Sequence, residues 1–150
     1  GGEGNAGGEG NAGVGGGAGG GGAAASSEAL RARAERAKAR GKWSEALRLY
    51  ESAAAGGDAE AMYQAGRALA GLGEWEGKLP RDLGRAKAWL KRADRQGHIG
   101  AMLAMGHLTR SSVPTARAWY EKVLRQPGPE DTPQKQAARE ALAGLEREGR

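Results

Sequence analysis

Small and apolar residues recur every three or four positions between Ala29 and Leu145, and polar residues fill the positions between them. This spacing places the apolar side chains on one stripe of an α-helix. No segment shows the strict alternation of apolar and polar residues that is typical of a half-buried β-strand. The pattern therefore predicts an all-α protein.

Residues that favour helix ends divide the pattern into short segments. Serine and aspartate cap the first turn of a helix, and glycine and proline interrupt or end one. We expect about seven short helices in series. They run from a cap at Ser26 or Ser27 to Gly41, from Trp43 to Gly56, from Asp58 to Gly71, from Asp82 to Gly97, from His98 to Thr109, from Pro114 to Pro127, and from Thr132 through Leu145.

The helical region contains an internal repeat. A shift of 40 residues superposes identical residues, namely Ala46 on Ala86, Ala53 on Ala93, Gly57 on Gly97, Ala61 on Ala101, Met62 on Met102 and Gly66 on Gly106. A further shift of 30 residues places Ala86 on Ala116, Trp89 on Trp119 and Leu90 on Tyr120. The difference of ten residues falls in the segment 75–80. A repeat of this length predicts helical hairpins that bury their apolar faces by stacking on one another.

The repeated block resembles a Sel1-like repeat. The resemblance rests on Ala61, Met62, Gly66, Asp82, Ala86, Trp89, Ala93, Gly97, Ala101, Met102 and Gly106. The hairpin before it is similar to a tetratricopeptide (TPR) unit through Trp43, Ala46, Tyr50 and Ala53, although Ala34 stands where that family usually has glycine. The resemblance covers about residues 28–124. It implies an α-solenoid of about three Sel1-like/TPR-like hairpins over residues 26–150, which binds proteins as a scaffold or adaptor.

The same resemblance implies a groove lined by the first helix of each hairpin. Its predicted lining is Arg31, Glu35, Lys38, Tyr63, Arg67, Leu103, His107 and Arg110. This surface is mixed and cationic, so we expect it to bind a partner segment of acidic character. Trp75, in the inserted loop, has two interpretations: an anchor for the partner, or a side chain that folds back over the helices.

Composition separates residues 1–25 from the rest of the chain. Residues 1–22 hold 14 of the 28 glycines, and residues 1–12 are two copies of the hexapeptide GGEGNA. Such a segment has too little apolar surface to offset the entropy lost on ordering. We expect a disordered, Gly-rich N-terminal tail.

The remaining composition favours a binding protein over an enzyme. The chain has no cysteine, and its two histidines, His98 and His107, have no carboxylate at metal-ligand spacing, so we expect neither a cofactor nor a metal. No apolar run is long enough to span a membrane. The net charge of +5 leaves an alternative open: a structural subunit of a larger ribonucleoprotein or organellar assembly, with RNA as a less favoured partner.

Overall fold

The computed structural model describes residues 26–148, and this part of the chain is all-helical, as predicted. The predicted tail, residues 1–25, lies outside the described residues. Seven α-helices and one 3-10 turn follow one another along residues 26–148. They are α1 (Ser27–Ala39), α2 (Trp43–Ala55), α3 (Ala59–Ala70), η2 (Gly73–Trp75), α4 (Leu83–Arg95), α5 (Ile99–Leu108), α6 (Val113–Arg125) and α7 (Pro133–Glu148).

Polar side chains cap the starts of α1, α3, α4 and α5. Ser26 caps α1, because its hydroxyl oxygen accepts a hydrogen bond from the backbone N–H of Ala29 at 3.0 Å. Asp58 and Asp82 cap α3 and α4 in the same way, at 2.8 and 3.1 Å. His98 does the same for α5, since its Nδ1 accepts from the N–H of Ala101 at 3.1 Å. Each cap satisfies one of the amide groups that a helix start leaves without a partner.

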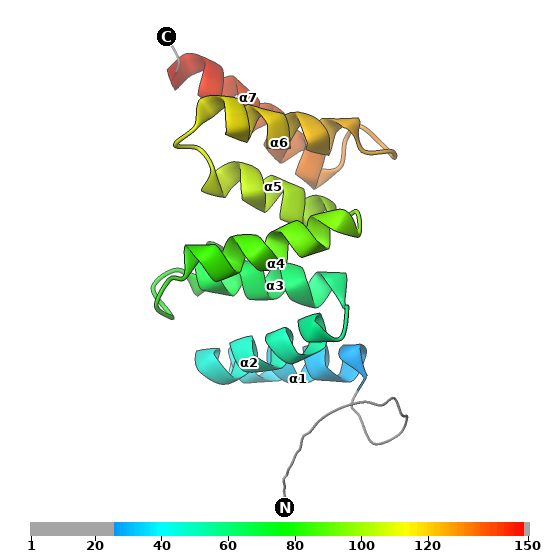
Figure 1. The fold of residues 1–150 in the computed structure, drawn as a ribbon, viewed down its shortest axis with the longest axis vertical. Helices are drawn as coiled ribbons and strands as arrows, with labels where there is room; N and C mark the ends of the chain where they lie inside the picture. The colour runs from blue at the N-terminus through cyan, green and yellow to red at the C-terminus, as the bar shows by residue number, and fades with distance from the viewer. Residues whose placement is uncertain (1–25, 149–150) are drawn as a thin grey trace, which may run out of the picture.

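The helices stack in chain order along the long axis of the molecule (Figure 1). The most extensive contacts join α1 to α2 and α3 to α4, and α5 packs on α6 to the same extent as α2 packs on α3. The first six helices thus follow one another as three consecutive helical hairpins. Further contacts join α3 to α5 and α5 to α7. The helices α3, α5 and α7 therefore make one layer, which α1 continues through its ion pairs to Asp58 and Glu74. The helices α2, α4 and α6 make the other layer, in front of the first in Figure 1.

Residues that the repeat superposes occupy equivalent positions in the core. Ala46, Ala86 and Ala116 are each fully buried, at the same place in α2, α4 and α6. Gly57 and Gly97, which are 40 residues apart, end α2 and α4 with φ angles of +101° and +84°. Glycine adopts this left-handed conformation without the steric cost that other residues incur. The repeated residues thus mark repeated turns and repeated contacts.

Two glycines let neighbouring helices approach closely. A Cβ atom on Gly66 of α3 would lie 2.6 Å from the Cγ atom of Leu90 in α4. A Cβ atom on Gly106 of α5 would lie 2.5 Å from the ring of Tyr120 in α6. The glycines superpose in the repeat, and so do Leu90 and Tyr120. The glycine on the first helix of a hairpin therefore makes room for a large side chain on the second.

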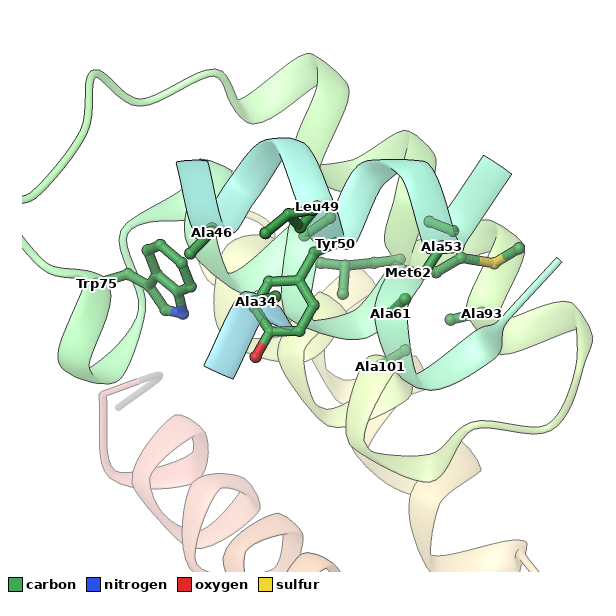
Figure 2. Close-up of a cluster of buried hydrophobic side chains, with 14 of the residues drawn as sticks. Ala34, Ala46, Leu49, Tyr50, Ala53, Ala61, Met62, Trp75, Ala93 and Ala101 are labelled. Atoms are coloured by element: carbon green, nitrogen blue, oxygen red, sulfur yellow. The ribbon is translucent and has the colours of Figure 1, made fainter. Parts of the chain in front are cut away.

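The side chain of Trp75 is fully buried and does not stand out on the surface. The loop between α3 and α4 folds back, and Figure 2 shows the indole within the same apolar cluster as Tyr50 and Ala46. Its ring packs edge-on against Trp43 of α2, with centroids 5.2 Å apart, and against Tyr50, with centroids 6.3 Å apart. Burying so large an apolar ring lowers the free energy of the folded chain, which explains why the indole is not exposed. Of the two interpretations of Trp75, the structure confirms the second.

Candidate functional site

The predicted lining residues of α1 and α3 lie on one face and are tied together by ion pairs. The Nε atom of Arg31 lies 3.0 Å from a carboxylate oxygen of Asp58, the residue that caps α3. Lys38 Nζ and Arg67 Nη2 both bind the carboxylate of Glu74, at 2.8 and 2.6 Å. The 3-10 turn η2 thus supplies an acid that joins α1 to α3. Glu74 was not among the predicted lining residues.

These ion pairs change the charge that the face presents. The two cations beside Glu74 hold the pKa of its carboxyl at about 2, with the hydrogen bond from Arg67 as the main cause. The guanidinium of Arg67 also donates a hydrogen bond to Gln64 at 2.8 Å. The three cations of the predicted lining on α1 and α3, Arg31, Lys38 and Arg67, are therefore each paired with an acid of the chain. The expectation of an acidic partner depended on free cations, and these cations already have acidic partners within the chain.

Tyr63 extends this face toward the next hairpin. Its ring lies against the imidazole of His98, with centroids 4.6 Å apart, and burial raises the pKa of its hydroxyl. The Nε2 atom of His98 in turn lies 2.8 Å from a carboxylate oxygen of Glu60. This hydrogen bond is the main cause of the lowered pKa of Glu60. Because Nδ1 of His98 already accepts a hydrogen bond from the backbone of α5, Nε2 carries the hydrogen and donates a hydrogen bond to Glu60.

The three remaining predicted residues contact α6 and α7. Leu103 packs partly buried against the apolar cluster of α6 and α7. His107 lies 2.7 Å from the hydroxyl oxygen of Tyr120, and Arg110 lies 2.8 Å from a carboxylate oxygen of Glu148. Partial burial lowers the pKa of His107, and the nearby Arg110 adds to this effect. The predicted surface consequently has two parts, one on α1 and α3 and one at α5, α6 and α7.

A pocket of about 280 Å³ opens on the first part of the predicted surface, between α1 and α3. Its walls are Glu28, Arg31, Ala32 and Glu35 of α1 and Glu60 and Gln64 of α3. One residue of the other layer, Tyr50 of α2, completes the lining. Only Arg31 and Glu35 of this set were predicted from the sequence. Glu28 and Glu60 were missed, although each continues the helical stripe of a predicted residue, three positions before Arg31 and Tyr63.

The link through Glu74 predicts a pH-dependent stability. Because the pKa of Glu74 falls from its ordinary 4.5 to about 2 in the folded chain, its contribution is present above pH 4.5 and is lost as the pH falls toward 2. Glu74→Gln should lower the free energy of unfolding at neutral pH by about 1 kcal/mol, because solvent screens so exposed a carboxylate. Urea unfolding at several pH values measures the difference between the two chains. A difference that stays constant down to pH 2 would contradict the assignment.

Two other kinds of site, a metal centre and a membrane-spanning helix, are absent from residues 26–148. No three or more His, Asp or Glu side chains among them gather where they would hold a metal ion. No helix in the same range is long and apolar enough to cross a membrane.

Comparisons with known proteins show a similarity to a bacterial regulator. No protein-family model matches the chain, and no solved structure matches it. The chain is similar to an exopolysaccharide production negative regulator of Rhizobium meliloti (strain 1021), with 38% identity over 105 residues. The similarity covers 68% of this chain and 38% of the regulator, so the chain spans well under half of that protein's length.

Proposed function

We propose that this chain is a non-enzymatic protein–protein interaction module, an α-solenoid of Sel1-like or TPR-like hairpins that holds a segment of a partner protein. The observation that carries the proposal is the face of α1 and α3, where a lined pocket lies beside an ion-pair network that fixes both helices. Concave sites with a few placed polar groups are the usual places for ligands. Stacked hairpins present such faces repeatedly along one layer.

The similarity to the Rhizobium regulator is compatible with this proposal. That protein is named as a negative regulator of exopolysaccharide production. A module that binds proteins is one way for a chain to regulate without catalysis. We extend to this chain only the general idea of regulation through binding.

A second candidate function rests on the other layer. The exposed face of α4 carries Lys91, Arg92 and Arg95 with no acidic residue between them except the partly buried Asp94. Such a face suits a subunit of a ribonucleoprotein or another large assembly, since clustered cations attract phosphate. Arg92, however, lies over the ring of Trp89 at 4.8 Å, so this aromatic side chain is covered and not open to a base.

Capture of partners separates these two functions. The full chain, immobilised and exposed to a lysate of its source with and without nuclease, should retain the same few proteins in both samples. Retention that disappears after nuclease treatment would support the ribonucleoprotein assembly instead. Salt dependence gives a second criterion, because contacts to several phosphates make affinity fall steeply with salt concentration.

A further inference from the structure

The pocket between α1 and α3 has a buried hydroxyl at its base. Tyr50 is 1% exposed, and its hydroxyl has no hydrogen-bond partner within residues 26–148. Figure 2 shows its side chain extending from α2 past Ala34 of α1, with the hydroxyl oxygen at the tip. Tyr50 lines the pocket from the layer of α2, so its side chain, which extends past Ala34, reaches the pocket wall. A buried hydroxyl without a partner is unfavourable, and a ligand that pairs with it removes this cost.

The pocket walls offer many acceptors and few free donors. Glu28, Glu35 and Glu60 contribute three carboxylates. Arg31 is the cation of the lining, and Asp58 already balances it at 3.0 Å. The pocket is therefore electronegative, although the sequence predicted a cationic surface here.

The remaining polar groups of the lining add to the excess of hydrogen-bond acceptors over free donors. Gln64 is already engaged, since its oxygen accepts from Arg67 and its nitrogen donates to Glu60, both at 2.8 Å. The oxygens of Glu60 accept from Gln64 and His98, and each carboxylate oxygen retains a second lone pair. Glu35 has Lys38 at 3.5 Å, a weaker contact that a closer cation can replace. A complementary ligand must therefore bring positive charge and several N–H donors.

The size of the pocket limits what that ligand is. Pockets that hold whole small molecules occupy about 300–1,000 Å³. The volume of about 280 Å³ is at the lower end of this range and suits one long side chain. A guanidinium group carries five N–H donors in a planar fork that matches carboxylates, and its hydrocarbon stem can lie along Ala32.

We propose that the pocket between α1 and α3 binds an arginine side chain of the partner segment. The carboxylates of Glu28, Glu35 and Glu60 accept hydrogen bonds from the guanidinium, and the Tyr50 hydroxyl oxygen accepts another at the base. This inference rests on the proposed function, because the arginine belongs to the segment that the module holds.

A small-molecule probe tests the pocket directly. The full chain, labelled with ¹⁵N, is titrated with N-acetyl-arginine methylamide and followed by nuclear magnetic resonance. Saturable shifts should appear for residues 28–35 and 60–64. N-acetyl-citrulline methylamide, which has nearly the same shape but no charge, should bind about tenfold more weakly, the factor that corresponds to 1.4 kcal/mol. Equal binding of both compounds, shifts elsewhere, or no shifts at all would overturn the proposal.

Variants test which side chains of the pocket bind the arginine probe. The double variant Glu28→Gln with Glu35→Gln should weaken binding of the arginine probe about tenfold, because it removes two charge-assisted acceptors. Tyr50→Phe should weaken it while leaving the fold intact, since the hydroxyl has no hydrogen bond to lose. The matched control is Glu121→Gln, an exposed glutamate of α6 in the other layer, and it should change nothing. Unchanged binding in the double variant would also overturn the proposal.

The outcome remains separate from that of the proposed function. If the arginine probe fails to bind but the chain still retains a protein partner through this face, the arginine assignment is wrong and the module stands. If the probe binds as expected and no protein is retained, the pocket is confirmed and the module is wrong.

Discussion

Trp75→Ala should lower the free energy of unfolding by about 3–5 kcal/mol, the usual cost of truncating a fully buried large aromatic side chain. The indole is fully buried and packs against Trp43 and Tyr50, and the ammonium of Lys38 lies 5.8 Å above its ring. Alanine leaves a cavity between α2 and the loop that carries Glu74. Since small domains are stable by about 5–15 kcal/mol, this is a large share of the total.

Urea unfolding followed by far-ultraviolet circular dichroism measures this loss. Trp75→Phe is the control, because it keeps an aromatic ring in the cluster and the indole N–H has no hydrogen-bond partner in the described part of the chain. It should cost distinctly less than alanine. An exposed anchor residue would show the opposite behaviour: alanine would leave stability unchanged and reduce only partner binding.

Gly106→Ala should destabilise the chain by about 2 kcal/mol, even though alanine favours helices more than glycine does. The added Cβ atom would lie 2.5 Å from the ring of Tyr120. That ring has little freedom to move, since it is fully buried and its hydroxyl is held by His107 at 2.7 Å. The contact between α5 and α6 must therefore open, and the cost of the overlap exceeds the gain in helix propensity.

Gly144→Ala is the matched control for this prediction. Gly144 also lies inside a helix, α7, but a Cβ atom there would meet only the end of the Arg147 side chain, at 3.8 Å. Alanine should stabilise the chain at this position by about 0.5–1 kcal/mol. If both substitutions changed stability in the same direction, close packing at Gly106 would not be the reason for its glycine.

The helices could be predicted from the sequence because their boundaries are encoded locally. Ser26, Asp58 and Asp82 act on the backbone three residues away, and Gly57 and Gly97 act on their own φ angles. Such effects depend on neighbours in the chain and need no knowledge of the fold. The pairing of Gly66 with Gly106 was also visible, because repeated packing repeats the small residues.

The site was predicted only in part, because its chemistry depends on contacts between distant segments. Arg31, Lys38 and Arg67 counted as free cations in the sequence, but the fold brings Asp58 and Glu74 to them. Tyr50 belongs to an apolar stripe, and nothing local indicates that its hydroxyl is left without a partner beneath a pocket. Trp75 lies among charged residues, so its burial depends on the inserted loop reaching Trp43.

Binding of a partner segment to the face of α1 and α3 is tested most directly by replacing two exposed alanines with phenylalanine. Ala32 is exposed on α1 and lines the pocket, whereas Ala88 is exposed on α4 in the other layer. Phenylalanine at either position adds the same bulk to a helix surface.

The measurement is the dissociation constant of the retained partner for the unaltered chain, Ala32→Phe and Ala88→Phe. We expect Ala32→Phe to weaken binding by at least about tenfold, equivalent to 1.4 kcal/mol, and Ala88→Phe to leave it unchanged. Equal affinities for all three chains, or a loss confined to Ala88→Phe, would show that the partner does not bind the face of α1 and α3.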